Sequence, residues 1–171
     1  HQSALLARQD SGKEDAIAVV DSQWASMALG LIVIRAAKLA KDGASLQEVV
    51  HTAEEHRGKV DLLLFCDTLE YLQRGGRIGR AAALLGGFLK VKPVITLKDG
   101  EVVPVERVRT RSRALERLWE WTQGYSQLED FCVLYSGEDA DARELHRKVR
   151  ERFPQAQDYL VPVGPVIATH V

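Results

Sequence analysis

The hydrophobic and polar positions of the first sixty residues predict two helices. Residues 26–41 are apolar on most sides, which predicts a deeply buried helix, and Gly43 ends it. The segment Ser45 to Glu48 (SLQE) fits a capping box, in which serine and glutamate side chains bind each other's free backbone amides. A second helix is therefore expected to run through His56.

Alternating and continuous apolar runs predict the strands. Ala16 to Val20 (AIAVV) is a short β-rich run that ends in turn-forming residues, so we expect a strand there. From residue 60 the pattern predicts strand, helix, hairpin, helix, strand, helix and strand, at Val60 to Cys66, Ile78 to Leu85, Pro93 to Leu97 with Val102 to Val108, Thr110 to Gln123, Phe131 to Tyr135, Asp139 to Phe153 and Tyr159 to Val163. Asp99-Gly100 is a strong hairpin signal. This order predicts an α/β fold with a mixed sheet.

Composition narrows the class of protein. With 171 residues, 46% hydrophobic and 27% charged, the chain is expected to be globular rather than disordered. A formal net charge of -1 provides no overall field toward DNA or an anionic membrane. No apolar stretch approaches the roughly 20 residues that span a bilayer. Cys66 and Cys132 lie in apolar runs without metal-ligand spacing, so we interpret them as core thiols of a cytoplasmic protein.

The segment Asp67 to Arg80 (DTLEYLQRGGRIGR) follows a predicted buried strand. Its glycines allow close approach to a ligand or to another part of the chain, and they tolerate positive φ. Neither the P-loop nor the dinucleotide spacing is present, so a nucleotide-binding loop is the weaker interpretation. A structural turn that positions Arg77 is the stronger one.

The segment 161–171 (VPVGPVIATHV) ends an apolar stretch with Thr169 and His170. A single histidine in such a position is commonly a satisfied core residue. At a sheet edge, however, a titratable ring beside a hydroxyl suits the place where α/β folds gather ligands. Both interpretations remain open from the residues alone.

The third candidate is a series of arginines from Arg107 to Arg113 (RVRTRSR), extended by Arg117. Alternation around a strand-to-helix junction divides these side chains between faces. Nucleic-acid binding also favours aromatic neighbours and a basic domain, which the sequence lacks. We expect most of these arginines to be solvated, with one or two turned inward toward an anion.

The order and spacing of several motifs resemble a known family. DTLEYLQRGGRIG, FLKVKPVITLKDGEVVPVERVRTRSRALERL and PVGPVIATHV, preceded by QSALLA and AIAVVDSQWASMALGLIVIRAAKLAKDGASLQEVV, are similar to DegV-family proteins. The resemblance covers essentially the whole chain. It implies a two-domain α/β fold with a Rossmann-like N-terminal domain, incomplete here. Residues 1–58 would be the remainder of that domain and residues 59–171 the C-terminal α/β domain.

The resemblance also implies a function. Such proteins enclose a long-chain fatty acid between the domains, and some present its carboxylate to a fatty acid kinase subunit. By motif, His170 with Thr169 falls at the carboxylate end, Arg109 near the head group or the kinase-facing surface, and Arg77 on the Gly-Gly-Arg motif. The resemblance therefore implies a cytoplasmic lipid-binding carrier, not an enzyme, with no cofactor or metal.

Part of the expected site lies outside the chain. His1 begins within a predicted helix and residue 171 ends near a predicted strand, so we interpret the chain as incomplete. The family's N-terminal Asp-Ser strand and its carboxylate-binding Thr and Ser segments would precede His1. Ala81 to Leu89 and Met27 to Ile34 offer aliphatic material for an acyl tunnel, although core packing explains these segments equally well.

Two competing hypotheses remain. One is a phosphotransfer or hydrolytic α/β enzyme in which His170 is the nucleophile or base, although neither GxSxG nor HExxH occurs. The other is a nucleic-acid regulator acting through Arg107 to Arg113.

Overall fold

The computed structural model describes residues 1–84 and 91–170, and it divides into two compact units. Unit 1 comprises His1–Asp61 and unit 2 comprises Leu62–Val171. The assignment of residues 1–58 and 59–171 to two domains of a larger protein stays a prediction. Within the described residues, no helix is long and apolar enough to cross a membrane.

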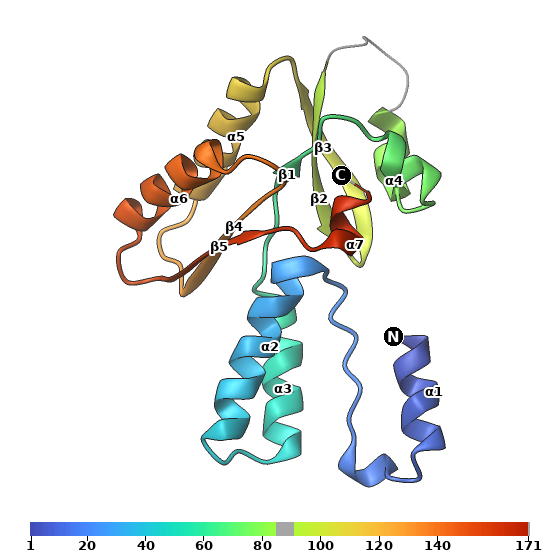
Figure 1. Ribbon diagram of the computed structural model, residues 1–171. Helices are drawn as coiled ribbons and strands as arrows, with labels where there is room; N and C mark the ends of the chain where they lie inside the picture. Colours follow the sequence, from blue (N-terminus) through green and yellow to red (C-terminus); the bar gives the residue numbers. More distant parts are fainter. Residues whose placement is uncertain (85–90, 171) are drawn as a thin grey trace. The chain divides into compact units, whose positions relative to one another are not determined.

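Unit 1 is helical. It contains α1 (Gln2–Asp10), the 3-10 turn η1 (Glu14–Ala16), α2 (Ser26–Lys41) and α3 (Leu46–Arg57). Helices α2 and α3 lie side by side (Figure 1). The predicted capping box is present, because Ser45 Oγ accepts from the Glu48 N–H at 3.3 Å and the Ser45 N–H donates to the Glu48 carboxylate at 2.7 Å.

The prediction of a strand at Ala16 to Val20 is wrong. Residues 17–25 lie in no helix or sheet, and Ile17 is exposed. A strand needs a neighbour for its N–H and C=O groups, and the described part of unit 1 contains no other strand. The segment is instead fixed at its end, where the Trp24 indole N–H donates to the Arg57 carbonyl at 3.0 Å.

Unit 2 begins with a three-stranded antiparallel sheet in the order β1-β2-β3. Its strands are β1 (Leu64–Phe65), β2 (Lys92–Lys98) and β3 (Glu101–Val108). The predicted hairpin is confirmed: Asp99 and Gly100 both have positive φ, at 54° and 79°, as a tight primed turn requires. The first strand is much shorter than the predicted run from Val60 to Cys66.

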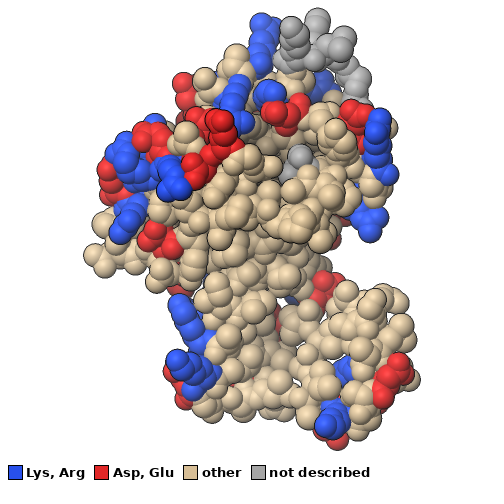
Figure 2. Space-filling view, in the orientation of Figure 1, with Lys and Arg blue, Asp and Glu red and all other residues tan. Residues whose placement is uncertain are grey.

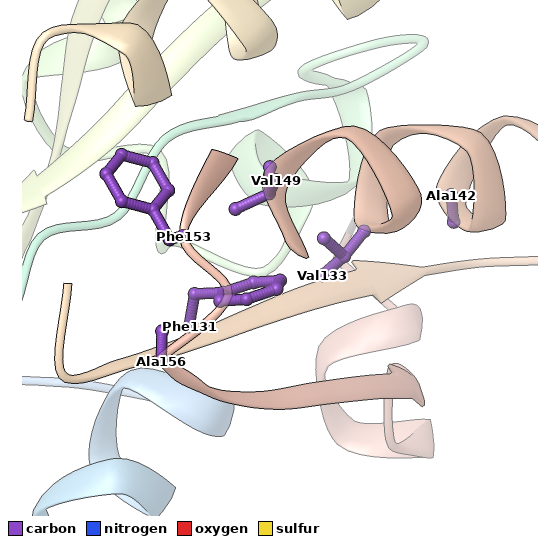
Figure 3. Packing of buried hydrophobic residues seen from close by; sticks show 6 residues of the cluster. All are labelled: Phe131, Val133, Ala142, Val149, Phe153 and Ala156. Atoms are coloured by element: carbon purple, nitrogen blue, oxygen red, sulfur yellow. The ribbon is translucent and has the colours of Figure 1, made fainter. Parts of the chain in front are cut away.

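The rest of unit 2 is a parallel pair of strands covered by helices. Strand β4 (Asp130–Tyr135) pairs with β5 (Gln157–Pro162), and α6 (Ala140–Arg152) connects them. Figure 3 shows apolar side chains of β4 and α6 packed together. Val149 of α6 belongs to this cluster, and only 1% of its surface is exposed. Helix α5 (Arg111–Gln123) contacts both α6 and the hairpin. The parallel and antiparallel pairings of the predicted α/β fold therefore lie in two separate sheets.

Cys66 is buried and Cys132 is half-buried. Burial raises the pKa of each thiol from its ordinary value near 9 to about 12, and for Cys66 the neighbouring Asp67 adds to the effect. Alkylating reagents attack the thiolate, so neither thiol should react at pH 8.5 in the folded protein. We expect iodoacetamide to add no mass before denaturation and two adducts after it. Rapid labelling of the native protein, measured by intact mass, would contradict this burial.

Candidate functional site

The end of the chain places His170 after a single helical turn rather than on an extended strand reaching a sheet edge. Pro165 opens α7 (Pro165–Ala168), where its fixed φ and missing N–H suit the first helical position. The His170 N–H donates to the Ile167 carbonyl at 2.9 Å and closes the turn. The side chain of His170 is half-buried.

The imidazole of His170 packs against Gly75, the C-cap residue that directly follows α4 (Glu70–Arg74). A Cβ atom built on Gly75 would lie 2.5 Å from His170 Cε1 and 2.6 Å from Nδ1, so a side chain at this position would require the imidazole to move. His170 Nδ1 is buried and has no hydrogen-bond partner among residues 1–84 and 91–170. Two segments far apart in the sequence thus meet at a glycine.

The other glycines of the motif serve the shape of the loop. Gly76 has φ +66° and faces open space. Gly79 opens the 3-10 segment η2 (Gly79–Leu84) with φ +51°, and a Cβ there would lie 2.8 Å from the Val102 carbonyl oxygen of β3. Gly79 therefore holds the loop against the hairpin, while Gly75 receives the histidine.

Arg77 belongs to the same loop. Its side chain is exposed, and Nη1 donates to the Gly75 carbonyl at 2.9 Å while its backbone N–H donates to the Leu72 carbonyl at 2.9 Å. The guanidinium thus binds the carbonyl of the residue that supports His170. This gives Arg77 a link to the histidine through Gly75.

Thr169 is exposed beside the histidine, and its hydroxyl donates to the Val166 carbonyl at 2.8 Å. A hydroxyl carries a single hydrogen. In this arrangement the Thr169 hydroxyl offers a ligand only acceptor lone pairs, and donation to a carboxylate requires it to leave Val166.

No described hydrogen bond or ion pair joins Arg109 to this group. Arg109 is exposed between β3 and Thr110, the residue that caps α5, and it forms no hydrogen bond or ion pair with any part of the chain that is described. Its neighbours are engaged: Arg107 with the Ala83 carbonyl, Arg111 with Asp141, Arg113 with Glu116 and Glu120, and Arg117 with Glu106. Figure 2 likewise shows basic and acidic side chains mixed over α6 rather than separated by sign. The arginine series does not form a basic patch.

The beginning of the glycine-rich segment is tied to the sheet. Lys92 Nζ of β2 lies 2.8 Å from Asp67 Oδ1, and this hydrogen bond lowers the pKa of the Asp67 carboxyl. Leu69 and Leu72 are buried in a cluster with Cys66 and Ile95. The segment is thus anchored at its start by a charge pair and apolar packing, and near its end by Gly79.

A polar hollow of about 270 Å³ lies elsewhere in unit 2, past the carboxyl end of β4. Arg111, Ser136, Glu138, Ala140 and Asp141 line it, and none of the predicted site residues does. Its charged walls do not suit an acyl chain. The predicted tunnel segment Ala81 to Leu89 is described only through Leu84, and residues 85–89 lie outside the described part.

Sequence reasoning identified both contacting segments but missed the contact between Gly75 and His170. The only available signal was the glycine pair, which permits close approach without specifying what approaches. Within the described residues, no group of three or more His, Cys, Asp or Glu could hold a metal ion.

A family model described as "Uncharacterised protein, DegV family" matches residues 1–171, all of the chain. The chain belongs to the DegV family. A DegV domain-containing protein of Streptomyces coelicolor is 36% identical over 173 residues, covering 99% of this chain and 61% of its own length. The chain therefore spans about three fifths of the curated DegV relatives that it matches.

Solved DegV structures share the fold. The structure described as fatty acid binding of a DegV family protein from Thermus thermophilus is 38% identical, with a TM-score of 0.84 over 99% of this chain and 61% of the other. The Fatty Acid Kinase (Fak) B3 protein of Streptococcus pneumoniae, loaded with linoleic acid, is 21% identical, with a TM-score of 0.85 over 99% and 62%. At that identity the second likeness establishes the α/β fold alone.

Proposed function

We propose that this protein binds a long-chain fatty acid and that the His170 site receives its carboxylate for presentation to a partner kinase. The observation that carries the proposal is the packing of His170 on Gly75, which fixes one edge of the ring in the interior. The Thermus relative, described by its fatty acid binding, supports the ligand class. Presentation to a kinase is supported by the motif resemblance alone.

The acyl tail and the carboxylate head group contribute to the binding free energy in different ways. An acyl chain of about sixteen carbons, at roughly 0.8 kcal/mol per buried methylene, contributes on the order of 10 kcal/mol before the costs of association. A carboxylate loses hydration in such a site, at several kcal/mol unless donors replace the water. The ring of His170 supplies one such donor, and Arg77 adds positive charge to the same loop.

The geometry favours a carrier over an enzyme that uses His170. A catalytic histidine is commonly oriented by a carboxylate or carbonyl on its second nitrogen. His170 Nδ1 has no such partner in residues 1–84 and 91–170. We propose that His170 positions the carboxylate and that the phosphoryl transfer chemistry belongs to the kinase, in the cytoplasm.

Mass spectrometry tests the ligand class. The protein, expressed with any flanking residues that its gene encodes, is expected to carry one fatty acid in native spectra and to release it on denaturation. Purified protein that carries no lipid and takes up no hexadecanoic acid would contradict the proposal. A stable phosphohistidine at His170 would instead favour the enzyme.

Presentation needs a second assay. Lipid-loaded protein, ATP and a candidate kinase are expected to yield acyl phosphate, trapped as the hydroxamate by hydroxylamine. The lipid-loaded protein with ATP alone should yield none, and product in that control would contradict the carrier role.

A further inference from the structure

The two nitrogens of the His170 ring lie in different surroundings. Nδ1 is buried toward Gly75 and has no hydrogen-bond partner in the described chain. The hydrogen bonds of the Gly75 backbone go to other groups, because its carbonyl accepts from Arg77 Nη1 and its N–H donates to the Tyr71 carbonyl, each at 2.9 Å. The ring lies on the side of Gly75 where a Cβ would stand, and that side carries no acceptor.

An N–H on Nδ1 would therefore be a buried donor without an acceptor among the described residues. Buried donors without an acceptor are rarer in proteins than acceptors with an unused lone pair. The neutral ring is therefore most stable with its hydrogen on Nε2.

We propose that Gly75 is a positioning residue that sets the tautomer of His170, so that the ring presents an Nε2–H donor to the ligand. The use of this donor rests on the proposed function, since a fatty acid carboxylate is an acceptor. A ring with the opposite tautomer would present a lone pair to the carboxylate and repel it. Gly75 thus decides which kind of head group the site accepts.

The chain contains a matched control for Gly75. Gly124 ends α5 as Gly75 ends α4, and both have right-handed helical conformations, with φ −69° and −76°. A Cβ on either residue would lie 3.2 Å from a carbonyl oxygen of the preceding helix, that of Trp121 or Tyr71. The chief difference between the two variants is therefore that alanine at position 75 would contact an imidazole and alanine at position 124 would not.

The tautomer is measurable by long-range ¹H–¹⁵N correlation on protein with labelled histidine, expressed with any flanking residues of its gene. The chain has five histidines, so the His170 signals are assigned from the spectrum of His170→Gln. We expect the wild type to show one tautomer with hydrogen on Nε2. Gly75→Ala is expected to lose that single pattern, and Gly124→Ala to keep it.

An Nδ1–H pattern in the wild type, or an unchanged His170 pattern in Gly75→Ala, would overturn the proposal. The wild-type spectrum decides even if Gly75→Ala does not fold. Hexadecanoic acid binding is measured on the same samples, and we expect it to be about tenfold weaker in Gly75→Ala than in Gly124→Ala. If the ring carries its hydrogen on Nε2 but the protein binds no lipid, only the proposed function is contradicted. If the protein binds lipid but the ring carries its hydrogen on Nδ1, only this inference is contradicted.

Discussion

Replacing His170 with alanine is expected to weaken fatty acid binding about tenfold to a hundredfold and to leave binding of the matching fatty alcohol unchanged. A hydrogen bond to a charged group contributes about 1.5–3 kcal/mol, and about 1.4 kcal/mol corresponds to a factor of ten in affinity. The alcohol keeps the apolar tail but lacks the carboxylate. Comparing hexadecanoic acid with hexadecanol by displacement of a fluorescent probe isolates the head-group contact.

His51→Ala is the control for this experiment. His51 is an exposed histidine of α3 whose Nε2 lies 3.7 Å from Glu55, so its removal tests for non-specific effects of losing an imidazole. Equal losses for acid and alcohol would mean that His170 shapes the acyl site rather than binding the carboxylate. Unchanged acid binding would remove His170 from the site altogether.

Gly79→Ala is expected to destabilise unit 2 by about 2–5 kcal/mol. The left-handed φ of +51° costs a residue with a side chain roughly 1–2 kcal/mol. The new Cβ would also meet the Val102 backbone at 2.8 Å, and such overpacking costs a further 1–3 kcal/mol or so. Val102 belongs to a paired strand, so the loop must move instead.

Gly76→Ala separates these two causes. Gly76 has a similar φ of +66° but faces open space, so only the conformational cost of about 1 kcal/mol is expected. Urea unfolding measures both variants, and a Trp24→Phe background leaves the signal to Trp119 and Trp121 on α5 of unit 2. Equal losses for the two variants would show that the contact with Val102 contributes nothing.

Local chemistry made several elements predictable. The Asp99-Gly100 turn and the Ser45 capping box each depend on residues within four positions of one another, so the sequence contains the whole interaction. The failed strand at Ala16 to Val20 shows the limit of such reasoning. Its composition suits a strand, but strand formation depends on a neighbour that the run itself does not encode.

The candidate site was likewise only partly predictable from the sequence. The sequence by itself determined the family, the α/β class, and the importance of the glycine-rich loop and of the segment that ends in His170. Only the tertiary structure showed that Gly75 receives the ring of His170, that Arg77 donates to the Gly75 carbonyl, and that no described hydrogen bond or ion pair joins Arg109 to either. The reason is physical: a glycine is selected there for the atoms it lacks, and an absent side chain leaves no periodic pattern that could identify its distant partner.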